Sequence, residues 1–278
     1  MKTIFYQFTF LFFINFLYCE SVITKVDDID TNTYEYTYYS SALDKENKFV
    51  IVLPVNYKNN DMPVPVLYFL HGAGRHHRSI IDMPEAKEII KNAKFVTIFP
   101  KGDNGWYIDS PVNISSKYES MITELIEICE KEFNIAKNPD KKAIGGWSMG
   151  GFGSMHYVQN HPDKFKIIAT IIALLDFPNI NLPKEQNHVI PDVMGADNVY
   201  WDCINPIKKI QFLKNLKIAI YAADKAFDYT MNSNFHMELN KYGINHSYKI
   251  QTGAHSFNIV LSFIPELYKF INLSFDLK

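Results

Sequence analysis

Residues 142–151 read KAIGGWSMGG. The first half is apolar, as in a buried strand, and a helical pattern begins at Met149. Between the two, Gly146-Trp147-Ser148-Met149-Gly150 fits the G-x-S-x-G pattern of a nucleophile elbow. In such a turn the serine hydroxyl is lifted out of the sheet, and the flanking glycines let the backbone pass without a Cβ clash. A glycine-rich turn with a capping serine would also fit the five residues alone. The strand and helix on either side favour Ser148 as a nucleophile.

Apolar runs and helical patterns alternate on both sides of this stretch. The alternation predicts a mostly parallel sheet with helices on both faces, in one domain over residues 21–278. Together with the nucleophile elbow, it indicates the α/β-hydrolase fold. Strands are expected at residues 34–38, 48–53, 64–70, 95–99, 142–146, 167–175, 217–222 and 247–251. Helices are expected at residues 118–133, 149–157, 230–242 and 257–270, the last with a kink at Pro265. Residues 179–201 are rich in proline and asparagine and predict an irregular excursion.

Chain order selects the general base. In this fold the residues follow as serine, acid and histidine, so the base lies after Ser148. His255 follows the last expected strand and precedes the last helix, which is where a base loop would reach the serine. His71 lies upstream and is expected to shape its loop. The backbone N–H groups of Ala73, after an early buried strand, and of Met149, at the start of a helix, are the expected oxyanion donors.

Other glycine and histidine motifs are incomplete. A G-x-G-x-x-G motif beginning at Gly72 would need glycine where His77 stands, and a P-loop would need lysine at Gly151. His76 and His77 are adjacent and have neither an H-E-x-x-H nor a C-x-x-C companion. We therefore expect no cofactor and no metal ion.

Several motifs together resemble the esterase D-type esterase family, which includes feruloyl and related carbohydrate esterases. The matching stretches are LHG at 70–72, GWYIDSP at 105–111, YE at 118–119, AIGGWSMGGFG at 143–153, HPDKF at 161–165, FH at 235–236 and GAHS at 253–256. The resemblance covers most of the chain from about residue 65. It implies an α/β-hydrolase without a cofactor and with a Ser-His-acid triad. It also implies that Trp106 and Tyr107 lie near the acyl or alcohol pocket, although packing in the core would suit them equally.

The triad acid departs from the family pattern. Relatives usually carry Gly-x-x-Asp after the penultimate strand, whereas here Ala223 and Ala226 stand at those two positions. Asp224 and Asp228 flank the expected place. Asp228 is preferred, because a longer loop carries it toward His255, and Asp224 is the alternative. A missing acid would orient the histidine poorly.

The N-terminus predicts export. Lys2 precedes a mostly apolar run at residues 8–18, which suits a signal peptide over residues 1–20 and is short for a membrane span. An uncleaved N-terminal anchor is the alternative. Asparagine sequons at Asn113, Asn245 and Asn272 are compatible with a secreted glycoprotein. The remaining Cys129 and Cys203 would form one disulfide or stay as separate thiols.

The charge balance limits the partners. The 28 basic and 30 acidic residues give a formal charge of −2, so nucleic acid is not an expected partner. No stable membrane insertion is expected after removal of the signal. The sequence predicts a secreted serine carboxylesterase acting on small or carbohydrate-linked esters, such as feruloyl or acetyl esters. An acyltransferase with the same triad and a catalytically impaired binding protein on this scaffold are the alternatives.

Overall fold

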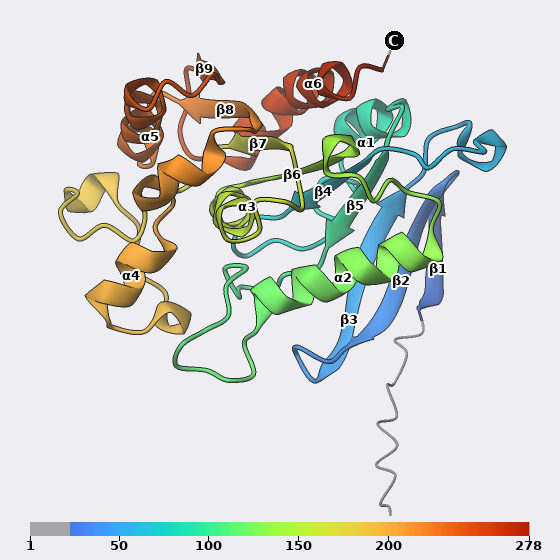
Figure 1. The fold of residues 1–278 in the computed structure, drawn as a ribbon, viewed down its shortest axis with the longest axis horizontal. Coiled ribbons are helices and arrows are strands. Elements are labelled where there is room, and N and C mark those ends of the chain that lie inside the picture. The colour runs from blue at the N-terminus through green and yellow to red at the C-terminus, as the bar shows by residue number, and fades with distance from the viewer. Residues whose placement is uncertain (1–22, 278) are drawn as a thin grey trace, which may run out of the picture.

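One nine-stranded sheet runs through the computed structural model, which describes residues 23–277 (Figure 1). Its strands are β1 (Thr24–Asp30), β2 (Thr33–Ser40), β3 (Lys45–Val52), β4 (Val66–Leu70), β5 (Val96–Pro100), β6 (Lys142–Trp147), β7 (Ile167–Ile171), β8 (Lys217–Ala223) and β9 (Ser247–Gln251). The spatial order is β1-β2-β3-β5-β4-β6-β7-β8-β9. In this spatial order, pairing is antiparallel from β1 to β5. It is parallel from β5 through β4, β6, β7 and β8 to β9.

The central strands are buried along their whole length. Every residue of β4, β5, β6 and β7 is buried, which is why these segments are continuous apolar runs in the sequence. Their carboxyl ends lie at one edge of the sheet, where parallel α/β sheets present their functional loops.

Helices cover both faces of the sheet (Figure 1). They are α1 (Pro84–Lys91), α2 (Tyr118–Glu132), α3 (Met149–Asn160), α4 (Asn198–Ile204), α5 (Tyr229–Lys241) and α6 (Phe257–Ser274). The shorter 3-10 helices are η1 (Tyr57–Asn59), η2 (Pro139–Lys141), η3 (Lys184–Gln186), η4 (Asp192–Met194) and η5 (Pro206–Leu213). Side chains of α1 and α6 pack into one hydrophobic cluster, and those of α2, α3 and α5 pack into the cluster on the opposite face.

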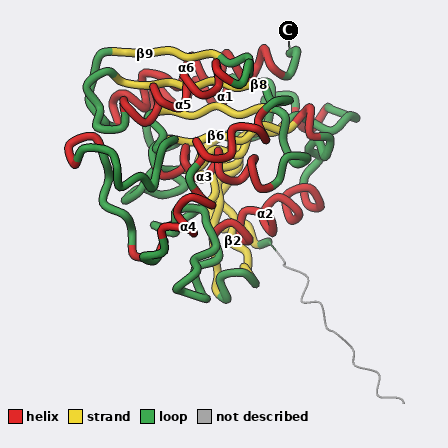
Figure 2. Tube along the Cα trace, turned by 60° about the vertical axis from the view of Figure 1, so that its left-hand side comes forward, coloured by secondary structure: helices red, strands yellow, loops and turns green. Residues whose placement is uncertain are grey.

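The fold predicted from the sequence is confirmed, with differences at short or polar elements. β1 and α1 were not expected: β1 is an exposed edge strand of sequence TKVDDID, and α1 buries only Ala86 and Ile90. α6 continues past Pro265 to Ser274. Residues 179–201 lie in the long connection between β7 and β8, which consists of loop and short helices around α4 (Figure 2).

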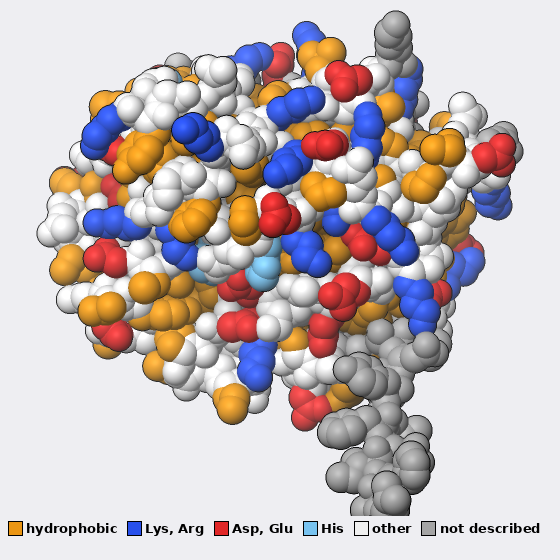
Figure 3. Space-filling view, in the orientation of Figure 1, with side chains coloured by type: hydrophobic (Ala, Val, Ile, Leu, Met, Phe, Trp, Pro, Cys, Tyr) orange, Lys and Arg blue, Asp and Glu red, His pale blue; other side chains and the backbone are white. Residues whose placement is uncertain are grey.

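The expected signal peptide at residues 1–20 lies outside the described residues. Within residues 23–277, no helix combines the length and apolar character needed to cross a bilayer. On the face shown in Figure 3, basic and acidic side chains are interspersed.

Candidate active site

Ser148 occupies the sharp turn between β6 and α3. Its φ of 53° and ψ of −121° place a non-glycine residue at positive φ, the strained backbone expected of a nucleophile elbow. The turn lies close against the end of β4. A Cβ atom on Gly146 would lie 2.5 Å from the Leu70 carbonyl oxygen, and one on Gly150 would lie 2.2 Å from it. Only glycine fits at either position, so the two glycines allow the elbow to form.

His255 and Asp228 complete a hydrogen-bonded chain with the serine. His255 Nε2 lies 2.9 Å from Ser148 Oγ. On the other side of the imidazole, Nδ1 lies 2.6 Å from Asp228 Oδ1. The Asp228 side chain is completely buried, whereas the His255 side chain is 21% exposed. Three residues from different loops are thus brought together in the order that nucleophilic catalysis requires.

Asp224, the alternative acid, has a different set of contacts. Its carboxylate accepts hydrogen bonds from Thr252 Oγ1 at 3.0 Å and from Gly253 N at 3.1 Å. Asp224 therefore holds the backbone of the loop that carries His255, whereas Asp228 contacts the imidazole itself. Backbone bonds from Asp224 N to Gln251 O and from Lys225 N to Gly253 O join the same two loops.

Two neighbours of the triad were not anticipated from the sequence. Asn232 Nδ2 donates to Asp228 Oδ2 at 2.9 Å and to the Ala173 carbonyl at 2.8 Å. The Phe227 ring packs against His255, with a centroid distance of 4.6 Å. Asn232 lies one helical turn after Asp228, so the i, i+4 spacing was the available signal for its contact. Both contacts restrict the triad to one arrangement.

The two residues expected to supply the oxyanion donors lie near Ser148. Met149 is the first residue of α3, so its N–H has no acceptor within the helix. Ala73 lies in the loop after β4 and lines the same pocket as Ser148 and His255. Asn104 Oδ1 accepts a hydrogen bond from Gly74 N at 2.8 Å and fixes the backbone immediately after Ala73.

His71 is the first residue of the loop after β4 and holds its backbone in place, as the sequence predicted. Its Nε2 accepts from Gly102 N at 2.9 Å, and its Nδ1 lies 2.9 Å from the Gly72 carbonyl oxygen. Nδ1 therefore carries the proton of the neutral ring. Burial lowers the pKa of His71 to about 4. Both ring nitrogens are occupied by backbone groups, so His71 supports the loop and does not face Ser148.

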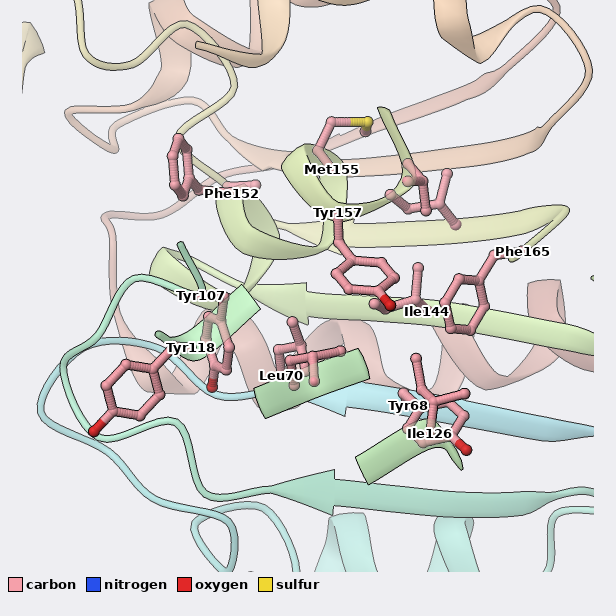
Figure 4. Close-up of a cluster of buried hydrophobic side chains, with 14 of the residues drawn as sticks. Tyr68, Leu70, Tyr107, Tyr118, Ile126, Ile144, Phe152, Met155, Tyr157 and Phe165 are labelled. Atoms are coloured by element: carbon pink, nitrogen blue, oxygen red, sulfur yellow. The ribbon is translucent and has the colours of Figure 1, made fainter. Parts of the chain in front are cut away.

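Trp106 and Tyr107 lie in the core and do not line the pocket. Tyr107 is completely buried, and Figure 4 shows it beside Leu70 in the cluster of buried side chains. Trp106 is 3% exposed and packs against the rings of Phe152, Phe177 and His188. The sequence allowed either a place near the substrate pocket or packing in the core, and the structure shows packing in the core. The Tyr107 hydroxyl nevertheless reaches the site's scaffold, because it bonds to the backbone of His71.

A pocket of about 190 Å³ adjoins the triad. It is lined by Gly72, Ala73, Arg75, Trp147, Ser148, Ile172, His255, Ser256, Phe257 and Val260. These residues come from the loop after β4, the elbow, the end of β7 and the start of α6. The volume is below the roughly 300–1,000 Å³ of pockets that enclose drug-sized ligands, so it suits a small group next to the reacting atoms.

Neither a metal-binding cluster nor a disulfide is present among residues 23–277. Within residues 23–277, no group of three or more His, Cys, Asp or Glu side chains could hold a metal ion. His77 pairs with the buried Glu35 at 2.6 Å. Cys129 is buried in α2 and Cys203 is exposed in α4, and both are free thiols. The disulfide alternative is thus absent from the structure.

The three sequons differ in exposure. Asn113 and Asn245 are exposed. Asn272 lies within α6, and its amide donates a hydrogen bond to the Leu277 carbonyl at 3.0 Å.

Comparisons with known proteins find sequence similarity to esterases. A family model described as "Putative esterase" matches residues 40–269. An esterase of Mycobacterium tuberculosis is 24% identical over 218 residues, covering 72% of this chain and 48% of that protein. The chain therefore spans about half the length of that curated relative. An acetyl esterase of Caldicellulosiruptor saccharolyticus is 23% identical over 258 residues, covering 86% of this chain and 97% of the relative.

The solved structure of a ferulic acid esterase superposes on this one with a TM-score of 0.75. The two sequences are 20% identical, and the match covers 87% of this chain and 98% of the other. At that identity the likeness establishes the α/β-hydrolase fold.

Proposed function

We propose that this chain, which belongs to the putative-esterase family whose model matches residues 40–269, is a serine carboxylesterase. It would act through Ser148, His255 and Asp228. The domain is that of a carboxylic ester hydrolase. The proposal rests above all on the continuous hydrogen-bonded chain from Asp228 Oδ1 through His255 to Ser148 Oγ. This geometry lies at a nucleophile elbow, beside a pocket that is open to small molecules.

Acylation follows from the positions of these atoms. Ser148 Oγ attacks the ester carbonyl carbon while His255 Nε2 accepts the hydroxyl proton. The carbonyl oxygen becomes negatively charged in the tetrahedral intermediate and is stabilised by the N–H groups of Ala73 and Met149. Asp228 holds the imidazole through Nδ1 and stabilises the imidazolium. His255 then donates its proton to the departing alcohol oxygen, and the C–O bond breaks.

Deacylation repeats these roles with water. His255 removes a proton from a water molecule, which attacks the acyl-enzyme carbonyl carbon. Collapse of the second tetrahedral intermediate breaks the bond to Ser148 Oγ and releases the acid. The proton on His255 returns to the serine, and the enzyme is restored.

We propose acetyl or feruloyl esters of carbohydrates as the substrate class. The names of the acetyl esterase and ferulic acid esterase relatives support this choice. The small pocket supports a compact group next to the reacting carbonyl. The complete triad arrangement favours a catalyst over the alternative of an impaired binding protein. An acyltransferase would use the same triad with an alcohol in place of water.

We also propose that the protein is secreted. Lys2 and the apolar run at residues 8–18 support removal of an N-terminal signal near residue 20. The exposed Asn113 and Asn245 would then be available for glycosylation. Expression of the full chain in a eukaryotic host, followed by N-terminal sequencing of protein from the medium, tests this directly. Retention of the intact chain in the membrane fraction would contradict it.

The catalytic proposal is tested with p-nitrophenyl acetate, p-nitrophenyl butyrate and methyl ferulate. We expect the wild type to hydrolyse at least one ester and Ser148→Ala to lose at least about 10³-fold in kcat. A fluorophosphonate probe should label the wild type and leave Ser148→Ala unlabelled. Product analysis with added alcohol separates free acid from a transferred acyl group. Full activity in folded Ser148→Ala would exclude the proposed nucleophile.

A further inference from the structure

Arg75 stands out among the side chains around the pocket. Of the ten residues that line it, Arg75 and the catalytic His255 are the only ones with ionisable side chains. Arg75 follows the oxyanion residue Ala73 by two positions on the loop after β4, and it is exposed. The cation therefore borders the pocket that also contains Ser148 and His255.

The guanidinium of Arg75 has no carboxylate partner in the part of the chain that the structure describes. It lies over the Phe257 ring instead, with Cζ 4.2 Å from the ring centroid. Such a contact orients the guanidinium plane without neutralising its charge. Arg78 on the same loop differs, since it pairs with Asp27 and Asp82.

Three carboxylates of the loops around the site have other partners. Asp228 is buried against His255 and Asn232. Asp224 accepts from Thr252 and Gly253. Asp103 pairs with Lys45 at 3.0 Å. The charge of Arg75 is therefore available to a ligand in the pocket.

The first turn of α6 adds to this positive potential. Ser256 caps the helix, and Ser256, Phe257 and Val260 all line the pocket. α6 has 18 residues, and the N–H groups of its first turn carry the positive end of the helix dipole. Arg75 and this helix terminus lie on the same pocket, so both favour an anionic group there.

The contact of Arg75 with Phe257 indicates whether the cation meets the acyl part or the alcohol part of the ester. The departing alcohol oxygen receives its proton from His255, and Phe257 follows His255 by only two residues. A group that pairs with the guanidinium on this side of the pocket is thus attached to the alcohol. We propose that Arg75 is a specificity residue that selects esters whose alcohol part carries a carboxylate, the guanidinium pairing with that carboxylate. This inference rests on the proposed esterase activity.

The test compares two phenyl acetates that differ in charge on the leaving group, 4-acetoxybenzoate and the neutral 4-acetoxybenzamide. The measured quantity is kcat/KM for the anionic ester divided by kcat/KM for the neutral one. Differences in leaving-group reactivity cancel when the same ratio is compared between variants. We expect Arg75→Gln to lower the ratio about fivefold, the size of an exposed ion pair, and Arg75→Lys to restore part of it. The wild-type preference should shrink as NaCl is raised, because salt screens an exposed charge pair.

Arg78→Gln is the matched control, since it removes the same charge from the same loop outside the pocket. Its ratio should equal that of the wild type. A ratio unchanged in Arg75→Gln would overturn the inference while leaving the esterase proposal intact. Absence of hydrolysis of every ester would instead reject the esterase proposal itself.

A second substrate pair places the charge on the acyl side, with mono-4-nitrophenyl succinate and 4-nitrophenyl butyrate, each corrected for uncatalysed hydrolysis. We expect Arg75→Gln to leave this ratio within about twofold of the wild type. An Arg75-dependent preference in this pair alone would overturn the assignment to the alcohol part.

Discussion

The Tyr107 hydroxyl lies 3.1 Å from the His71 backbone nitrogen and 3.3 Å from the His71 carbonyl oxygen. His71 is the first residue after β4, so a completely buried phenol fixes the point at which the chain leaves the sheet toward Ala73. The hydroxyl accepts from the N–H group and donates to the carbonyl. Tyr107 therefore fixes, from inside the core, the loop that carries the proposed oxyanion donor Ala73, called here the oxyanion loop.

Tyr107→Phe should lower kcat about tenfold with little change in KM. The variant leaves the buried His71 N–H without its acceptor, and the loop can relax away from the position that stabilises the oxyanion. Substrate binding in the ground state does not depend on that donor, which separates the two constants. Steady-state kinetics on p-nitrophenyl acetate measure both.

Tyr157→Phe is the control for Tyr107→Phe. Tyr157 is also buried, and its hydroxyl bonds to Thr123 Oγ1 at 2.9 Å, away from the oxyanion loop. The free energy of unfolding should fall by a similar amount in Tyr157→Phe and in Tyr107→Phe, but kcat should be unchanged in Tyr157→Phe. Equal kcat losses in both variants would show that the effect is general destabilisation.

Asp228→Asn should lower kcat by about 10⁴-fold, whereas Asp224→Asn should cost less than about tenfold. The first change removes the anion that faces His255 Nδ1 and stabilises the imidazolium. The second weakens two exposed hydrogen bonds that hold the base loop. Kinetics of both variants on one ester, with circular dichroism to verify folding, measure the difference. A larger loss in Asp224→Asn would reverse the assignment of the acid.

The fold and the meeting of Ser148 with His255 were accessible from the sequence because both depend on local patterns. The buried parallel strands are continuous apolar runs, and the elbow at Ser148 needs glycine at fixed positions on either side. Chain order placed the base after the serine, which left His255 as the candidate on the last loop. These signals do not depend on how distant segments pack.

What the sequence left open depends on packing between distant segments. Asp224 and Asp228 both follow β8, and only the course of the turn shows which carboxylate meets His255. The motif around Trp106 and Tyr107 gave no indication of the direction of the side chains, which turn into the core. The hydrogen bond between Tyr107 and His71 joins residues 36 positions apart, so no local pattern predicts it.

Cys129 and Cys203 should differ in reactivity. Cys203 is exposed, and Cys129 is completely buried, where burial raises the pKa of its thiol well above the usual value. A thiol reagent such as iodoacetamide should therefore modify Cys203 in the native protein and reach Cys129 only after unfolding. Peptide mapping by mass spectrometry distinguishes the two. In Cys203→Ser, Cys129 should remain unmodified under native conditions. Protection of both Cys129 and Cys203 in the native wild type would point to a disulfide between them instead.

Stability should fall as the pH is lowered below about 7, in part because of His71. Burial lowers the pKa of this ring to about 4, against about 6.5 in an unfolded chain. Between these values the unfolded chain binds a proton that the folded protein does not, so the free energy of unfolding decreases as pH falls. Above about pH 6.5 both states are neutral, and below about pH 4 both are protonated, so the effect is confined to this window. Its size between pH 7.5 and pH 5 is about 2 kcal/mol.

Urea unfolding of the wild type and of His71→Gln at pH 7.5 and pH 5 isolates this contribution. The difference between the two proteins should shrink by about 2 kcal/mol at the lower pH, because glutamine does not titrate. His76→Gln, which changes an exposed neighbour on the same loop, is the control for introducing glutamine there. If His71→Gln lost as much stability as the wild type between pH 7.5 and pH 5, His71 would have to be protonated in the folded protein. Gly102 N–H would then lose its acceptor, and the loop that carries Ala73 would have to be held in another way.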